Sequence, residues 1–234
     1  LAEQLPDMLI YGMYPEVRTA STERDKQFIL NELTSSYLLK DILEFEKIKG
    51  TKILHDLLTL IAFQVSNEVS RRELASQLGI DYKTVGRYLN LFEKSFILYN
   101  LRGYSRNLRS EITRTSKYYF YDTGVRNAII ANFNSLDRRN DVGALWENFM
   151  IMERIKTRSY LGIPGQNYFW RTWEQKEIDL IEERDGSLFA YEFKWSNKKQ
   201  PRAPKQFTEA YPGSHFIVVT PNNWSDFASP VETH

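Results

Sequence analysis

Two helix-capping signals between Ser70 and Asp81 limit the fold of this chain more than any other feature of its sequence. Ser70 and Glu73 match a capping box, in which an N-cap hydroxyl and a glutamate three residues later begin a helix. Gly79 suits the left-handed C-cap of that helix, and Asp81 can cap the next helix after a tight turn. An apolar-periodic helix is predicted just upstream, over residues 52–65. Three helices with a glycine-containing turn between the last two are typical of a helix-turn-helix.

Two strand-like runs, residues 97–104 and 117–122, follow and extend the prediction to a winged helix-turn-helix over residues 51–137. This region holds twelve basic and eight acidic residues, a net charge of +4, which makes it the candidate for binding DNA. The second helix would then enter the major groove while the wing contacts phosphates. The candidate nucleic-acid-binding residues are Lys83, Thr84, Arg87, Arg106, Arg109 and Arg114. Winged helices also dock proteins, so both kinds of partner stay open.

The ends of the chain carry no catalytic signal. Residues 1–50 are predicted to be a helical connector, because apolar residues recur every three or four positions over residues 21–46. A turn is predicted upstream, at residues 11–16. A polar, Arg-rich linker is expected at residues 132–141, and residues 222–234 are assigned to a tail.

Residues 138–221 are predicted to form an α/β domain with the order helix, strand, strand, strand, helix, strand. Residues 143–156 carry an apolar helical stripe, and residues 177–181 alternate polar and apolar side chains as a half-buried strand does. Asp185-Gly186 is a strong hairpin signal that joins this strand to the next. The expected fold class is therefore α+β and multidomain: a helical connector, a winged helix-turn-helix, and this α/β domain.

Charged residues on these strands form the candidate catalytic site. Residues two apart on a strand share a face, so Glu192 and Lys194 point the same way, and hairpin pairing would bring Asp179 beside them. Asp179, Glu192 and Lys194 are the predicted catalytic residues. Glu147, from the preceding helix, would join Asp179 and Glu192 as a ligand of Mg²⁺. Two carboxylates on a hard cation with an amine nearby suit metal-assisted phosphodiester cleavage.

Sequence context distinguishes this Glu-x-Lys pattern from a second one at Glu174-Gln-Lys176. Such a pattern occurs about once in a chain of this length. The second copy falls in a polar turn, whereas Glu192-Phe-Lys194 ends a strand paired with one that carries an aspartate. Two observations favour a purely structural role for these residues. Buried carboxylate–lysine pairs can stabilise a fold without taking part in catalysis. In addition, residues 138–234 hold thirteen basic and thirteen acidic residues, so this region lacks the excess of positive charge that is typical of a nuclease.

Seven short motifs follow one another along the chain: Tyr11-Gly-Met-Tyr-Pro-Glu-Val17, Tyr37-Leu-Leu-Lys-Asp-Ile42, Asp122-Thr-Gly124, Gly143-Ala-Leu-Trp-Glu-Asn-Phe149, Phe169-Trp-Arg-Thr172, Glu177-Ile-Asp179 and Tyr191-Glu-Phe-Lys-Trp-Ser196. In this order they resemble the C-terminal half, usually labelled a domain of unknown function, of a large group of bacterial and archaeal AAA-type ATPases. The resemblance implies an N-terminal P-loop ATPase module, then a winged helix, then a restriction-endonuclease-like domain similar to the PD-(D/E)xK nucleases. Glu147, Asp179, Glu192 and Lys194 match its nuclease-like positions.

The chain departs from that family pattern in two respects. It contains no Gly-x-x-x-x-Gly-Lys-Ser/Thr run, so we expect ATP to be bound by an N-terminal module of a longer protein and not by these 234 residues. The first residue, Leu1, fits a fragment of such a protein. In addition, Glu177-Ile178 precedes Asp179 where the nuclease motif has a proline, which weakens the match to that motif.

Three functions stay open on the sequence alone. The first is a Mg²⁺-dependent nuclease, or a nucleic-acid-binding relative, directed by the winged helix and driven by the ATPase. The alternative is a non-enzymatic docking or regulatory module of the ATPase on a degenerate nuclease fold, and the third is a purely structural portion. The absence of cysteine excludes disulfides and thiolate zinc sites. It is also compatible with a reduced, cytoplasmic setting, which we expect for this protein. No apolar run approaches the roughly 18 residues of a membrane span, so no membrane contact is expected. Oligomer formation stays open.

Overall fold

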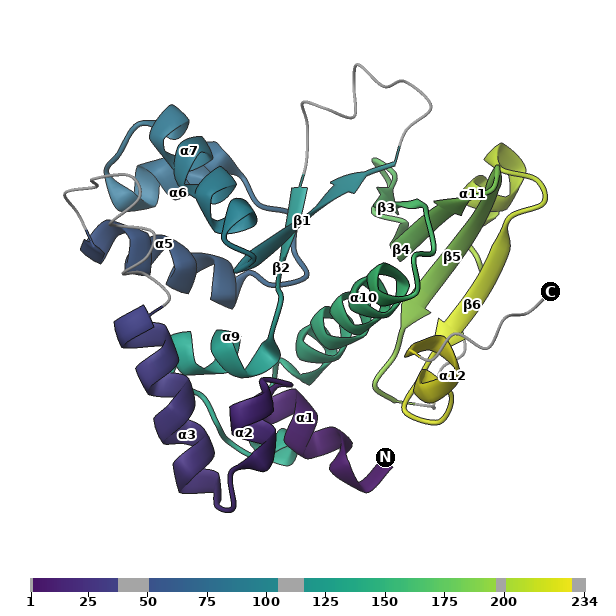
Figure 1. The fold of residues 1–234 in the computed structure, drawn as a ribbon. Helices are drawn as coiled ribbons and strands as arrows, with labels where there is room; N and C mark the ends of the chain where they lie inside the picture. Colours follow the sequence, from purple (N-terminus) through teal and green to yellow (C-terminus); the bar gives the residue numbers. More distant parts are fainter. Residues whose placement is uncertain (1, 38–50, 105–115, 197–200, 229–234) are drawn as a thin grey trace. The chain divides into compact units, whose positions relative to one another are not determined.

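The structure is a computed structural model that describes residues 2–37, 51–104, 116–196 and 201–228 (Figure 1). The described residues form ten α-helices and a six-stranded mixed sheet with the strand order β2-β1-β3-β4-β5-β6. The chain divides into two compact units: a first unit of Leu1–Asn100 and Lys117–Asp141, and a second unit of Leu101–Ser116 and Val142–His234. Within the described ranges, no helix is long and apolar enough to cross a membrane.

The N-terminal part of the first unit contains more and shorter helices than the sequence predicts. A 3-10 turn, η1 (Ala2–Gln4), precedes α1 (Leu5–Tyr11), α2 (Pro15–Thr19) and α3 (Glu23–Glu32), and a π-helical turn, η2 (Leu33–Tyr37), follows them. The backbone N–H of Asp25 donates to Thr22 Oγ1 at 3.1 Å, and this cap begins α3. The single helix predicted over residues 21–46 is therefore interrupted at residue 33, and its end lies outside the described residues.

The helix caps predicted between Ser70 and Asp81 are confirmed in α6 (Arg71–Leu78) and α7 (Tyr82–Lys94), which follow α5 (Thr51–Phe63). Ser70 Oγ accepts the N–H of Glu73 at 3.3 Å, and Gly79 ends α6 in the left-handed region with φ 65°. Asp81 Oδ2 accepts the backbone N–H groups of Lys83 and Thr84 at 2.9 and 3.3 Å. Local hydrogen bonding therefore sets the boundaries of both helices, as the residue types indicate.

A short helix, α9 (Thr123–Ile129), is absent from the sequence prediction and holds the first unit together. It follows β1 (Leu98–Gly103) and β2 (Ser116–Phe120) and precedes a 3-10 turn, η3 (Leu136–Arg138). Asp122 caps it by accepting the N–H of Val125 at 3.1 Å. The Nδ2 group of Asn127 donates to the carbonyls of Leu9 and Ile10 at 3.1 and 2.8 Å, which ties the end of α1 to α9.

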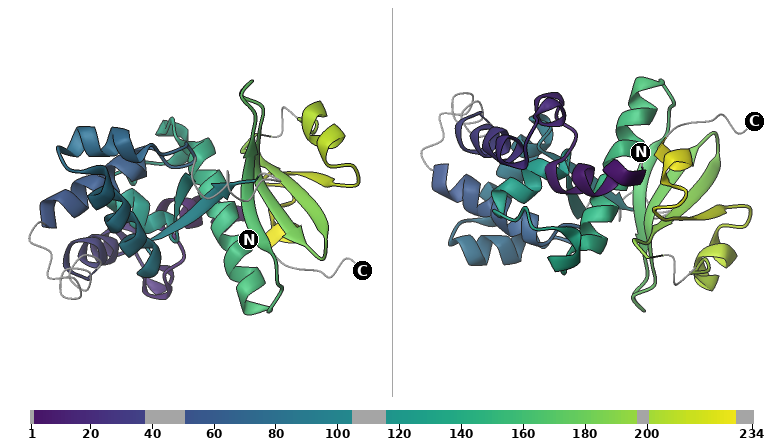
Figure 2. Two further views of the ribbon diagram at one scale, coloured as in Figure 1. Left: turned by 90° about the horizontal axis from the view of Figure 1, so that it is seen from above. Right: turned by 90° about the horizontal axis from the view of Figure 1, so that it is seen from below.

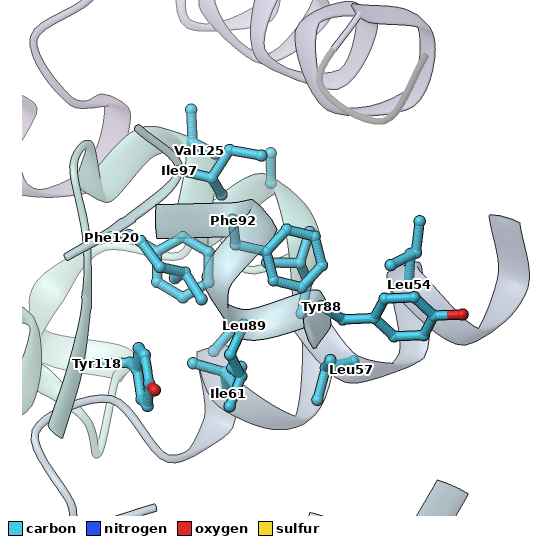
Figure 3. Packing of buried hydrophobic residues seen from close by; sticks show 14 of the residues in the cluster. Leu54, Leu57, Ile61, Tyr88, Leu89, Phe92, Ile97, Tyr118, Phe120 and Val125 are labelled. Carbon is cyan, nitrogen blue, oxygen red and sulfur yellow. The ribbon is translucent and has the colours of Figure 1, made fainter. Parts of the chain in front are cut away.

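Apolar side chains from α5, α7 and β2 form the core of the first unit (Figure 3). Leu57, Ile61, Leu89, Phe92 and Phe120 are almost completely buried there. Burial of each such side chain contributes roughly 1.5–3 kcal/mol. Apolar side chains also pack around the turn between α6 and α7: Leu74, Ala75, Val85, Tyr88, Leu89 and Phe92 are buried, while Leu78 and Ile80 are partly buried.

The segment predicted as a linker is an ordered end of the first unit. Arg139 Nε lies 2.8 Å from Asp141 Oδ1, its Nη2 donates to Asn127 Oδ1 at 2.8 Å, and Arg126 forms a second ion pair with Asp141. Burial opposes ionisation of Asp141, but the hydrogen bonds from Arg139 and Arg126 outweigh it and hold the pKa of this carboxyl well below its ordinary value. The first unit ends at Asp141.

The second unit has the element order that the sequence predicts. It runs α10 (Val142–Tyr160), β3 (Gln166–Arg171), β4 (Glu177–Arg184), β5 (Ser187–Phe193), α11 (Lys205–Ala210) and β6 (His215–Val219). Strands β3, β4 and β5 are antiparallel neighbours, and β5 and β6 pair in parallel. Helices α10 and α11 cover opposite faces of these four strands (Figure 2).

The second unit has an ordered turn between β4 and β5 and a short helix after β6. The β4–β5 hairpin turns at Asp185 and Gly186, with φ 50° and 75°, and Arg184 pairs with Ser187, as the Asp-Gly signal predicts. The segment assigned to a tail contains a helix, α12 (Trp224–Ala228). Trp224 and Phe227 of this helix are buried, and the ring of Phe227 packs edge-on against Tyr191 at 4.8 Å.

Candidate active site

The register of the β4–β5 hairpin places Asp179 and Glu192 beside each other. Leu180 pairs with Tyr191, and Asp179 and Glu192 are the next residues outward on the two antiparallel strands. The charge of Asp179 contributes to the raised pKa of Glu192, so the two carboxyl groups lie within electrostatic reach of each other. The backbone N–H of Phe193 also donates to Asp179 Oδ2 at 2.8 Å. The hairpin therefore brings Asp179 close to Glu192, and the hydrogen bond from Phe193 holds the Asp179 carboxylate against the end of β5.

Lys194 completes this group at the end of β5. Its Nζ donates to Glu192 Oε1 at 2.5 Å, and its backbone N–H donates to the carbonyl of Val219 at 2.9 Å. The Lys194 side chain is 38% exposed and that of Glu192 is 14% exposed. The ammonium group therefore reaches solvent from a partly buried carboxylate pair. We call Asp179, Glu192 and Lys194 the carboxylate–lysine cluster.

The charges of the cluster act on one another. Burial and the charge of Asp179 raise the pKa of Glu192, and the hydrogen bond from Lys194 only partly opposes them. Burial would lower the pKa of Lys194, but its hydrogen bond to Glu192 and the charges of Asp179, Glu192 and Glu147 outweigh burial and raise it. Glu147 on α10 is thus within electrostatic reach of Lys194. A cation between Asp179 and Glu192 would relieve their mutual repulsion.

The predicted three-carboxylate ligand set of Glu147, Asp179 and Glu192 is not assembled as a metal cluster. In the ranges that the structure describes, no group of three or more His, Cys, Asp or Glu side chains could hold a metal ion. Asp179 and Glu192 remain as an adjacent pair. Mg²⁺ commonly binds through one or two carboxylates and keeps several waters, so the chemistry of this pair fits Mg²⁺ with water and substrate oxygens as the other ligands.

The two Glu-x-Lys patterns have different surroundings, as the sequence context indicates. Glu174 lies in the β3–β4 turn, where its Oε2 accepts a hydrogen bond from Gln206 Nε2 of α11 at 2.7 Å. Lys176 is exposed in the same turn. Glu192 and Lys194 instead contact each other beside an aspartate of the neighbouring strand.

Two family models match the chain. One, a domain of unknown function (DUF8612), matches residues 2–136, and the other, a domain of unknown function (DUF4143), matches residues 142–228. The first model covers more than half of the 234 residues. The chain belongs to the DUF8612 family. The two matches meet between residues 136 and 142, close to the division of the structure after Asp141, so the carboxylate–lysine cluster lies in the DUF4143 segment.

Three of the curated proteins that are similar to this chain are each described as an uncharacterized protein. One from Mycobacterium tuberculosis is 25% identical over 185 residues, which cover 78% of this chain and 41% of the relative. One from Methanocaldococcus jannaschii is 23% identical over 86% of this chain and 44% of its own length, and one from Haemophilus influenzae is 27% identical over 73% and 41%. This DUF8612 chain therefore spans about two-fifths of the length of these relatives. No solved structure matches it.

The predicted nucleic-acid-binding residues fall into two groups. Lys83 and Arg87 are exposed, and Thr84 partly buried, in the first turns of α7, whereas Arg106, Arg109 and Arg114 lie outside the described residues. Arg71 of α6 adds a charge that the sequence analysis missed. The Nη1 atom of Arg71 lies beside Gly86 of α7, 3.4 Å from the position that a Cβ atom would take on this glycine. The capping box at Ser70 places Arg71 at the start of α6, so the sequence did indicate a basic residue next to the turn.

A second charged cluster of the DUF4143 segment, around Glu182, was also missed. Glu182 is fully buried on β4, and its Oε1 lies 2.8 Å from Arg154 Nε and 3.2 Å from Arg158 Nη1 of α10. Arg184 Nε lies 3.1 Å from its Oε2, and the Tyr191 hydroxyl donates to the same oxygen at 3.4 Å. Arginines four residues apart on a helix share a face. The spacing of Arg154 and Arg158 in the sequence therefore indicated an acidic partner for this face of α10.

Proposed function

We propose that the second unit is a Mg²⁺-dependent phosphodiesterase that cleaves nucleic acid, with a fold similar to the PD-(D/E)xK nucleases. The observation that carries this proposal is the proximity of the Asp179 and Glu192 carboxyl groups, with the partly exposed side chain of Lys194 hydrogen-bonded to Glu192. The element order from α10 to β6 supports it, because it is the order that the family resemblance implies.

Each residue of the cluster has a distinct role in this proposal. A bound Mg²⁺ would polarise the scissile phosphate and lower the pKa of a bound water. Asp179 and Glu192 would hold the ion, and the Phe193 N–H would keep the Asp179 carboxylate oriented toward β5. Lys194 would stabilise negative charge on the phosphate oxygens, since its ammonium group reaches solvent. Glu147 would contribute charge at longer range, through Lys194.

Calorimetric titration with Mn²⁺ tests the cation site. Wild type is expected to bind one ion, and Glu192→Gln is expected to bind it more than about 10-fold more weakly, since changes even outside the ligand shell cost that much. Affinity should increase as the pH rises through the raised pKa of Glu192, because the carboxylate must be deprotonated to bind the ion. Glu209→Gln, an exposed glutamate of α11, is the matched control. Equal Mn²⁺ affinity in wild type and Glu192→Gln would refute the site.

We infer that the first unit is a winged helix that binds duplex DNA through the start of α7. Lys83 and Arg87 are exposed there, and Arg71 reaches the same helix from α6. Both helices are capped by side chains, so these basic residues project from a fixed frame. The ATPase that would drive the complex is assigned to the remainder of a longer protein, which agrees with a chain spanning about two-fifths of its relatives.

Salt dependence tests this nucleic-acid interface. Binding to duplex DNA should weaken steeply with added salt, and Lys83→Gln and Arg87→Gln should each reduce the slope of log affinity against log salt by about 1 if each contacts one phosphate. Lys52→Gln, at an exposed position of α5, is the control. Salt-independent binding, or none, would instead favour a protein-docking role for the first unit.

A further inference from the structure

Trp173 differs from the other tryptophans of the chain. Its side chain is 94% exposed, whereas Trp146, Trp170 and Trp224 are buried and Trp195 packs edge-on against Trp146 at 5.5 Å. A single exposed apolar side chain is ordinary on a protein surface and by itself carries no information. The position and the support of Trp173 make it informative.

The β3–β4 turn that carries Trp173 is held on several sides. The N–H of Thr172 donates to the Lys176 carbonyl at 2.9 Å, and the N–H of Lys176 donates back to Thr172 Oγ1 at 3.2 Å. Glu174 accepts the hydrogen bond from Gln206 described above, which fastens the turn to α11. The indole is therefore presented by an ordered backbone, so that a ligand stacking on it would not have to order the loop first.

The same turn lies close to the carboxylate–lysine cluster. Arg171 pairs with Glu177 across the hairpin, and Asp179 is two residues further along β4. Three strand steps separate Lys176 from Asp179, roughly 10 Å at 3.3 Å per residue.

Two basic residues, Arg171 and Lys176, lie in the same turn as the indole, and the two acids of the turn, Glu174 and Glu177, contact Gln206 and Arg171. The Lys176 side chain is exposed, and Arg171 is 31% exposed although its Nε lies 3.8 Å from Glu177 Oε2. An indole with cationic groups beside it is the combination that proteins use to bind single-stranded nucleic acid, where bases stack on the ring and cations follow the phosphates. Bases in a duplex are already stacked on each other, so this arrangement favours an unpaired base.

We propose that Trp173 stacks on an unpaired base of a single-stranded nucleic acid and so positions the neighbouring phosphate at Asp179, Glu192 and Lys194. This inference rests on the proposed phosphodiesterase function and specifies its substrate as single-stranded. Every base has a π-face, so binding at Trp173 should be tolerant of sequence. DNA and RNA share this chemistry, and the experiment separates them.

The test measures binding without cleavage. Fluorescein-labelled oligo-dT, oligo-rU and a duplex are titrated with the full chain in EDTA. Trp173→Leu is expected to weaken binding of at least one single strand about 5- to 150-fold and to leave duplex binding unchanged, while Trp173→Phe keeps most of the affinity because the phenyl ring still stacks. Binding of unlabelled single strand should quench tryptophan emission in wild type but not in Trp173→Phe. Tyr160→Leu, which removes another highly exposed aromatic of the second unit, is the matched control.

The outcomes separate this inference from the proposal on which it rests. If single-strand binding depends on Trp173 but no metal-dependent cleavage is observed, the stacking inference would be supported and the proposed phosphodiesterase function would be refuted. Asp179-dependent cleavage with equal single-strand affinity in wild type and Trp173→Leu would overturn stacking alone. Failure of wild type to bind either single strand, or affinity lost equally in Tyr160→Leu, would also overturn it, and Trp173 would then be better explained as a protein contact.

Discussion

Replacing Glu182 with glutamine is expected to lower the free energy of unfolding of the second unit by about 3–5 kcal/mol at neutral pH. Glu182 is fully buried between Arg154, Arg158 and Arg184, with carboxylate–guanidinium distances from 2.8 to 3.2 Å. Glutamine preserves the shape of the side chain but removes the negative charge that the three arginines contact in the described part of the chain. Three buried or partly buried guanidinium groups would then repel one another without compensation.

Tryptophan fluorescence during urea unfolding measures this loss. All five tryptophans, at positions 146, 170, 173, 195 and 224, belong to the second unit, so their emission reports on this unit alone. Glu183→Gln, the same substitution one residue further along β4 at a half-buried position, is the control and should change the free energy of unfolding by less than about 0.5 kcal/mol. A loss in Glu182→Gln no greater than in Glu183→Gln would show that the cluster contributes little.

Acid should remove the difference between wild type and Glu182→Gln. Burial opposes ionisation of Glu182, but the hydrogen bond from Arg154 and the charges of the three arginines outweigh it, so the pKa of Glu182 lies below its ordinary 4.5. The stabilisation from a lowered carboxyl pKa is fully present above the ordinary value and disappears as the pH falls through the folded-state pKa. The two proteins should therefore converge in stability as the pH is lowered through that range.

Features that depend on neighbours in sequence could be predicted. The Ser70 and Asp81 caps, the Gly79 C-cap and the Asp185-Gly186 turn are set by hydrogen bonds or dihedral angles within a few residues, so residue type alone indicates them. The proximity of Asp179 to Glu192 could be predicted for the same reason, because a tight hairpin fixes the register of its strands as far as Leu180 and Tyr191, the residues next to them.

Features that depend on tertiary contacts were missed. Helix α9 has only seven residues and no apolar period of its own, and it is held by Asn127 reaching α1 more than a hundred positions away. Helix α12 is buried through Trp224 and Phe227, which look like isolated aromatics in a polar segment. Glu182 resembles a solvent-facing strand residue until α10 brings its arginines over the sheet.

Replacing Asp179 with asparagine is expected to reduce Mg²⁺-dependent cleavage more than about 100-fold. Asparagine keeps an oxygen that can accept the Phe193 N–H but lacks the charge that would hold the cation. A metal ion stabilises the developing phosphate charge by several kcal/mol, and each 1.36 kcal/mol changes a rate tenfold. Asp226→Asn makes the same substitution at an exposed position of α12 in the same unit and should cleave at the wild-type rate.

Cleavage of labelled single- and double-stranded DNA and RNA, with Mg²⁺, Mn²⁺ or EDTA, tests the carboxylate–lysine cluster most directly. The structure predicts metal-dependent cleavage of a single strand by wild type and Asp226→Asn, and its loss in Asp179→Asn. Cleavage that persists unchanged in Asp179→Asn, or wild type that cleaves none of the four substrates with either metal, would contradict a phosphodiesterase site at Asp179, Glu192 and Lys194.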